Sequence, residues 1–152
     1  MAYCVVGDVQ TLFAHLTFGA STPVTTTHIT DTHIPATDAL IDATLRPYYT
    51  VPITAAGDLA LLRSISMRFT AQTVADILFR QLAAGGEAPN VPEDGATGKW
   101  GRTARVDLDA IATGKLALVS GRTAVADSGI YSQYDAVTTP SVKPLNRMTD
   151  EW

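Results

Sequence analysis

The chain has 152 residues, a formal net charge of −4 and a pI near 5.2, and its residues are 17% charged against 46% hydrophobic. This length predicts one domain, and the acidic balance argues against a duplex-binding module, which neutralises phosphates with Lys and Arg. A lone cysteine, Cys4, excludes an intramolecular disulfide and a zinc cluster built from cysteines. Apolar runs fall short of the roughly 20 residues that span a bilayer, so we expect a soluble protein made in the cytoplasm.

The low share of charged residues has a further consequence. Soluble proteins carry about 25% charged residues on average, so this chain has fewer charges than its surface would ordinarily use. We therefore expect part of the surface to be buried against other chains.

A short helix is expected over residues 7–16, where apolar side chains recur at helical spacing and Asp8 lies near the positive end of the helix dipole. The apolar residues are Val9, Leu12, Phe13 and Leu16. The next segment, FGASTPVTTT, breaks this pattern, and one of its threonines is expected to cap the following helix.

A second helix is expected from about Thr27 to Tyr49, because its apolar residues are separated by steps of seven, four and three and so share one face. These residues are Ile34, Ile41, Leu45 and Tyr48. Pro35 lacks an N–H and crowds the preceding turn, so we expect a kink or a late start near it. Asp38 and Asp42 are interpreted as a like-charge pair that faces water.

The longest predicted helix runs from Ala56 to Ala84, with Asp58 in its first turn and two glycines after its end. Its apolar residues fall on two faces. One face carries Leu62, Ile65 and Phe69, and the other carries Met67, Ala71, Val74, Leu78 and Leu82. One partner layer would leave one of these faces uncovered, so we expect the helix to lie at the centre of the fold or at a subunit interface.

Residues 85–101 are predicted to form a long loop, since they are rich in glycine, proline and acid. A fourth helix follows, and Gly114 is its expected left-handed stop. Its buried stripe is predicted to be Trp100, Ala104, Leu108 and Ile111. Arg105 and Asp109 are expected to form an i, i+4 pair on its outer side.

The remaining sequence predicts little regular structure. Two short strand-like pieces are expected, at Leu116 to Ser120 and at Ile130 to Tyr134. The predicted fold is therefore mainly α, a small helical bundle of about four helices around a long central helix. Residues 1–119 are expected to form the core and residues 120–152 an extended C-terminal arm.

Three features of the sequence partly match known chemical sites, but each departs from the pattern. HITDTH places His28 and His33 five residues apart, unlike the i, i+4 pair of a zinc helix. EDGATGKW departs from a phosphate-binding loop at Glu93 and at Trp100. Nothing in the sequence brings a base to Cys4. We therefore expect no enzyme activity and no catalytic, cofactor-binding or metal-ligating residues.

The order of the elements resembles a known family. The segments AYCVVGDVQTLF, ATDALIDATLRPYYTVPI and LLRSISMRFTAQTVADIL are similar to those of the head-to-tail adaptor (connector, or head completion) proteins of tailed bacteriophages, including the Mu-like Gp36 family. The resemblance covers about Ala2 to Leu118, and its most specific part is IDATLRPYYTVPI.

This resemblance implies a structural protein of the virion. Such subunits form a ring, typically of twelve copies, that docks beneath the portal protein and leads to the tail. The ring extends the channel, through which DNA passes without specific binding, and it carries no enzymatic activity. Other readings stay open: a tail terminator or stopper in the same neck, or a small ligand-binding domain.

The polar C-terminal arm is too poor in apolar residues to fold alone, so we expect it to lie along a neighbouring subunit, the portal or a tail-side protein. Its candidate anchors are Tyr131, Tyr134, Leu145, Met148 and Trp152. The alternative is an unstructured tail whose aromatic residues are incidental.

Overall fold

A computed structural model describes residues 1–85 and 91–123, and of residues 82 and 83 only the backbone. The described ranges are mainly helical and contain no strand. The helices are α1 Val6–Thr11, α2 Thr26–His28, the π-helical turn η1 Ile29–His33, α3 Ile34–Leu45, α4 Ala56–Ala84, α5 Glu93–Ala96 and α6 Lys99–Ala112. The prediction of a mainly helical fold is therefore confirmed.

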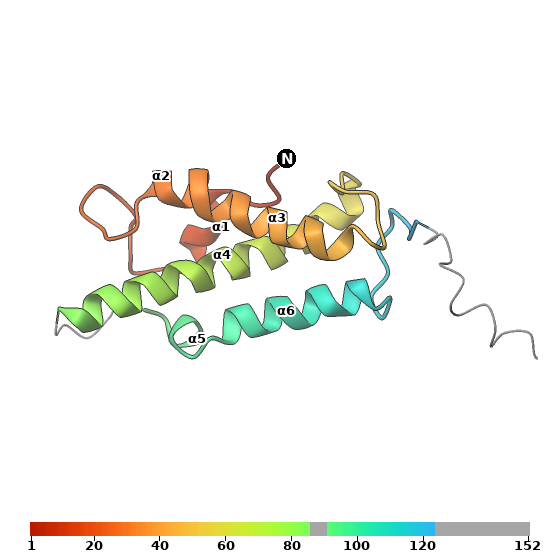
Figure 1. The fold of residues 1–152 in the computed structure, drawn as a ribbon. Coiled ribbons are helices and arrows are strands. Elements are labelled where there is room, and N and C mark those ends of the chain that lie inside the picture. The colour runs from red at the N-terminus through yellow and green to blue at the C-terminus, as the bar shows by residue number, and fades with distance from the viewer. Residues whose placement is uncertain (86–90, 124–152) are drawn as a thin grey trace, which may run out of the picture.

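Three long helical segments lie side by side (Figure 1). α2, η1 and α3 form one continuous rod, α4 returns antiparallel to it, and α6 runs antiparallel to α4 on the other side. α4 contacts α1, η1, α3, α5 and α6, and α3 also contacts α6. The predicted central position of the longest helix is thus confirmed.

α4 begins and ends where the sequence indicates, from Ala56 to Ala84. Both of its apolar faces are used within the bundle. The buried residues are Leu62 and Ile65 on one face and Ala71, Val74 and Leu78 on the other, while Phe69 and Met67 are half-buried. The side chain of Leu82 lies outside the described part of the chain.

Pro35 does not break the rod. The turn before it is π-helical: the N–H of Ile34 donates to the carbonyl of Ile29, five residues back. The wider turn accommodates a proline, which cannot donate and crowds the turn before it. The predicted threonine cap is confirmed, since the side chain of Thr25 accepts a hydrogen bond from the N–H of His28 (3.2 Å).

The interior is divided into two apolar clusters. The first cluster contains Cys4, Val9, Phe13, Phe18, Val24, Ile29, Ile34, Ala71, Val74, Ala75, Leu78 and Trp100. The second contains Tyr3, Ile41, Leu45, Tyr49, Ile53, Leu62, Ile65, Ala104, Leu108, Ile111 and Leu118. Along both α3 and α4, buried polar residues separate the two: Thr37 and Asp38 on α3, and Ser66 and Thr70 on α4.

α1 is shorter than predicted. It ends at Thr11, and residues 12–16 continue in turns rather than in the helix expected to reach Leu16. The side chain of Gln10 explains the difference. Its amide group donates to the carbonyls of Phe13 and Leu16, and its carbonyl accepts from the N–H of Phe18. These bonds satisfy backbone groups of residues 13–18 that α1 itself does not pair.

The second helix also ends early, at Leu45 rather than Tyr49, and Tyr49 is buried in place of the predicted Tyr48. The expected loop over residues 85–101 contains the short helix α5. Gly114 has φ of 78°, which confirms the left-handed stop of α6. The four residues of the predicted α6 stripe are all buried, as expected.

Leu116 to Ser120 was expected to be a strand and is not one. Leu118 is buried, and residues 119 and 120 form a turn. The reason lies in α4, because the Asp58 carboxylate accepts hydrogen bonds from the N–H groups of Val119 (2.7 Å) and Ser120 (2.8 Å). A side chain takes the donors that a neighbouring strand would have used. Residues 130–134, the second expected strand, lie outside the described ranges.

Candidate functional site

A groove lies between α4 and α6 and is called here the α4–α6 groove. It has a volume of about 520 Å³. It is lined by Phe69, Gln72, Thr73 and Asp76 of α4 and by Gly98, Gly101, Arg102, Arg105 and Val106 of the α6 region. The lining combines apolar, hydroxyl, amide, carboxylate and guanidinium groups, a mixture also found where protein surfaces meet.

The floor of the groove is held by one side chain. Gln72 donates to Asp76 (2.8 Å) and to the carbonyl of Gly95 (2.9 Å), and its carbonyl accepts from the N–H of Gly101 (3.4 Å). Gly101 allows this close approach, since a Cβ there would lie 3.0 Å from Cγ of Gln72. The groove is therefore preformed by contacts inside the bundle.

The rim of the groove is exposed, and its positive charges are not paired with acids within the described ranges. Val106 is 62% exposed, and Arg102 and Arg105 are both exposed. Within the described ranges, neither arginine forms an ion pair, and the expected pairing of Arg105 with Asp109 is not seen. Asp107 pairs instead with Arg68 of α4 (2.9 Å).

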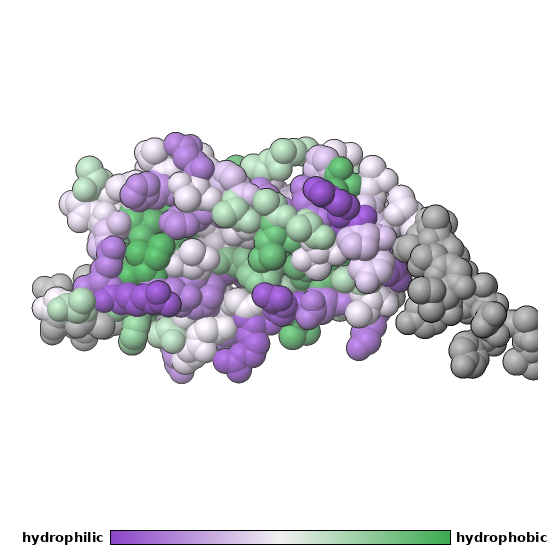
Figure 2. Space-filling model, in the orientation of Figure 1, coloured by the Kyte–Doolittle hydropathy of each residue, from purple (hydrophilic) through white to green (hydrophobic). Residues whose placement is uncertain are grey.

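Large apolar side chains are exposed at other places too. They are Met1 and Val5 at the N-terminus, Leu40 on α3, Phe79 on α4, and Leu116 and Val119 after α6. On the face seen in Figure 2, apolar areas lie along the seam between the α3 rod and α4, separated by polar groups. The exposed apolar residues thus come from separate elements rather than from one patch.

A second cluster of polar groups is buried beneath the N-terminal segment. Asp38, only 6% exposed, accepts hydrogen bonds from the N–H of Tyr3 (3.0 Å) and from Oγ of Ser66 (2.6 Å). The Tyr3 hydroxyl donates to Asp42 and accepts from the N–H of Ile53 (3.1 Å). The interpretation of Asp38 as a water-facing residue is therefore wrong. Asp38 shares the helix face of Ile34 and Ile41, at steps of four and three, so its burial was readable from the same spacing.

Burial raises the pKa of the Asp38 carboxyl above its ordinary value, and the nearby Asp42 acts in the same direction, although hydrogen bonds from Ser66 and Tyr3 oppose them. Burial also raises the pKa of the Tyr3 hydroxyl. The pKa of the Cys4 thiol is raised by burial as well, with Oγ of Ser66 3.2 Å from its sulfur. A protonated, buried thiol is a poor nucleophile, so this cluster is built for structure rather than for covalent chemistry.

The two histidines of HITDTH are closer in space than their sequence spacing indicated. The expectation that His33 would point away from His28 assumed an α-helix, whereas both residues lie in or beside the π-helical turn and line one hollow of about 280 Å³. Burial, followed by the neighbouring His28, lowers the pKa of His33. Within the described part of the chain, no group of three or more His, Cys, Asp or Glu residues is arranged to hold a metal ion.

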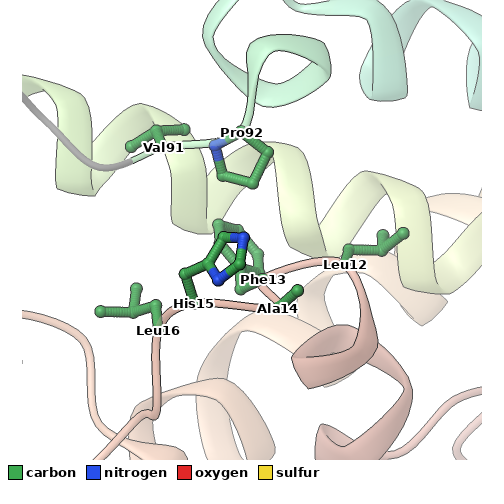
Figure 3. Close-up of a pocket in the computed structure, with 7 residues that line it drawn as sticks. All are labelled: Leu12, Phe13, Ala14, His15, Leu16, Val91 and Pro92. Atoms are coloured by element: carbon green, nitrogen blue, oxygen red, sulfur yellow. The ribbon is translucent and has the colours of Figure 1, made fainter.

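One further hollow, of about 230 Å³, lies at the end of α1. Figure 3 shows its lining from two segments, residues 12–16 after α1 and Val91 with Pro92 before α5. Phe13 forms its inner side and packs edge-to-face against Trp100, with ring centroids 5.3 Å apart. The hollow is largely apolar and contains one titratable group, His15, so it offers no set of catalytic groups.

The predicted arm anchors, Tyr131, Tyr134, Leu145, Met148 and Trp152, all lie outside the described residues. The surface feature formed by Val106, Arg102 and Arg105 was not expected from the sequence. Val106 lies on the polar side of α6, and the apolar stripe of that helix is complete without it. An unexplained apolar residue on a polar helix face was the available signal.

Among the described helices, none combines the length and the apolar character that a membrane span requires. Comparisons of the chain with protein-family models, with curated proteins and with solved structures found no match.

Proposed function

We propose that this protein is a ring-forming head-to-tail adaptor of a tailed bacteriophage. In this proposal it docks beneath the portal, extends the DNA channel and provides the attachment surface for the tail. The order of its elements resembles that family. The observation that carries the proposal is a finished bundle that still exposes large apolar side chains on separate elements.

The bundle needs no further partner for its own interior. Within the described ranges, every buried side-chain nitrogen and oxygen has a hydrogen-bond partner. The exposed apolar side chains therefore do not reflect an incomplete core. Single exposed apolar residues are ordinary, but Val5, Leu40, Phe79, Val106 and Val119 together, in a chain with few charges, favour burial against other chains.

A ring requires two different surfaces on each subunit, because a head-to-tail contact joins unlike patches. The exposed apolar residues on different helices, Leu40 on α3 and Val106 on α6, would supply two such surfaces. A formal charge of −4 also suits a wall along which DNA slides without being held.

Native mass spectrometry of the purified full-length chain, alone and mixed with isolated portal rings, tests the proposal. We expect a cyclic oligomer of about a dozen copies, formed in solution or on the portal. A monomer that does not bind portal rings would refute the proposal. Binding to tail tubes but not to portal rings would favour the tail terminator or stopper.

A deletion sharpens the test. Removal of residues 134–152 is expected to leave the helical bundle folded, measured by circular dichroism, while docking to the neighbouring ring is lost. Unchanged docking would remove the arm from the mechanism.

A further inference from the structure

We propose that the α4–α6 groove binds residues 148–152, Met-Thr-Asp-Glu-Trp, of a neighbouring copy of the chain. This inference rests on the proposed function, because the neighbour is the next subunit of the ring. It assigns a receptor to two of the expected arm anchors, Met148 and Trp152.

Charge complementarity is the first argument. Arg102 and Arg105 are three residues apart on α6, so both guanidinium groups reach the same side of the helix and line the groove. In the described ranges, two other basic residues of α4 and α6 form ion pairs: Arg68 pairs with Asp107, and Lys99 pairs with Asp94. The groove arginines have no such partner there, and the 148–152 segment supplies two adjacent acids.

Shape and apolar surface are the second argument. Gly98 and Gly101 place no side chain over the floor, and Gln72 is held by its hydrogen bonds, so the space between the helices stays open. Phe69 and Val106 provide apolar flanks. A tryptophan side chain buries on the order of 200 Å² and stacks well beneath a guanidinium group, which is what Phe69 and the two arginines offer Trp152.

The path of the chain is the third argument. The N–H of Thr123 donates to the carbonyl of Tyr48 (2.9 Å), which fixes residue 123 at the end of the bundle where α3 ends. Residue 123 also lies near the C-terminal end of α6, whereas the groove lies near the N-terminal end of α6 (Figure 1). Exit point and groove are thus different surfaces of one subunit, as a closed head-to-tail ring requires.

The available chain length is large. Residues 124–147 number 24 and reach up to about 80 Å when extended, whereas the 14 residues of α6 span only about 21 Å. The segment is therefore long enough to extend well beyond α6 of its own subunit.

Cysteine cross-linking tests the contact in the full-length chain. With Thr73→Cys in the groove and Thr149→Cys in the 148–152 segment combined, mild oxidation is expected to give a ladder of covalently linked copies on a non-reducing gel. Either single variant is expected to stop at dimers, and Cys4 is buried and takes no part. An intrachain disulfide, or no disulfide between the two positions, would overturn the proposal.

Charge reversal provides a second, independent test. Arg102→Glu with Arg105→Glu, or Asp150→Arg with Glu151→Arg, is expected to raise the concentration for half-assembly about tenfold, and mixing the two variant chains should restore assembly. The matched control is Arg46→Glu with Arg80→Glu, exposed arginines outside the groove, which should assemble as the unaltered chain does.

The outcomes separate the two proposals. If the unaltered chain forms rings on the portal and the groove variants do so equally well, the inference is wrong while the proposed function stands. If the unaltered chain forms no oligomer and binds no portal, the proposed function itself is wrong.

Discussion

Two carboxylates with little exposed surface, Asp38 in the middle of α3 and Asp58 at the start of α4, have pKa values shifted in opposite directions. They are 6% and 3% exposed. The pKa of Asp38 is raised by burial, and the charge of Asp42 adds to the effect. Burial acts upward on Asp58 too, but bonds from the Ser120 hydroxyl and from the N–H groups of Ser120 and Val119 hold its pKa below the ordinary value. Asp58 receives three hydrogen bonds and Asp38 two, and this difference in donors favours the opposite directions of the two pKa shifts.

The position in the helix contributes to this difference. Asp58 lies in the first turn of α4, where the dipole favours a negative charge, whereas Asp38 lies well inside α3. One carboxylate therefore fastens a distant segment to the bundle as an anion. The other lies between two apolar clusters, where burial raises its pKa.

The largest effect is expected from Asp58→Ala. It leaves the N–H groups of Val119 and Ser120 without an acceptor and should lower the free energy of unfolding by about 3 kcal/mol. Urea denaturation at pH 7 measures this change. Asp58→Asn is the control, since it retains one oxygen acceptor and should cost less. Equal stability of the alanine variant would show that the segment after α6 is not fastened by this residue.

A smaller loss is expected from Ser66→Ala. Asp38 would lose its 2.6 Å donor in a buried site, and the free energy of unfolding should fall by about 1 to 2 kcal/mol. Thr73→Ala is the matched control on the same helix, because its exposed hydroxyl only bonds the carbonyl of Phe69. Urea denaturation should show the control within about 0.5 kcal/mol of the unaltered chain.

A still smaller change is expected from Asp38→Asn at pH 7. The amide removes a charge that burial disfavours, but its one oxygen can accept from only one of Ser66 and the N–H of Tyr3, so the free energy of unfolding should fall by about 1 kcal/mol. The comparison with Asp58→Asn in the same urea titration is decisive. If the Asp38 variant were the more damaging of the two, the contrast between the carboxylates would be wrong.

The pH dependence gives the finest comparison. Because the folded-state pKa of Asp58 is lowered, its contribution is present above the unfolded-state pKa, near 3.8, and is lost as the pH falls toward the folded value. Asp38 has the opposite sign: its folded-state pKa is raised, so stability increases as the pH falls through that value toward 3.8. Urea denaturation between pH 3 and 7 measures the slope of the unfolding free energy against pH. Asp38→Asn and Asp58→Asn should each remove a contribution to this slope, and the two contributions should have opposite signs. Slopes of the same sign would contradict this assignment.

Much of the bundle could be predicted because its helices carry unambiguous patterns. α4 matches from end to end, and the stripe Trp100, Ala104, Leu108 and Ile111 is buried as expected. Such patterns succeed because a helix that buries one face repeats its apolar residues at a period set by its own geometry. The arm anchors stay predictions.

The errors occurred where a single side chain overrides the periodic pattern. Gln10 takes up backbone carbonyls and ends α1 early. Asp58 takes the N–H groups of Val119 and Ser120, so that segment turns instead of forming a strand. In each case the deciding partner is a polar group whose hydrogen bond has no periodic signature.

By itself, the sequence determined the helical class, the boundaries of α4 and the inward stripe of α6, because these follow from local spacing. Only the tertiary structure decided that Tyr3 and Ser66 donate to Asp38, that His28 and His33 line one hollow, and that α4 and α6 leave a groove with two arginines on its rim. The reason is physical: the hydrogen-bond partners of a polar group and the shape of a surface depend on which helices meet, and residues distant in sequence set those meetings.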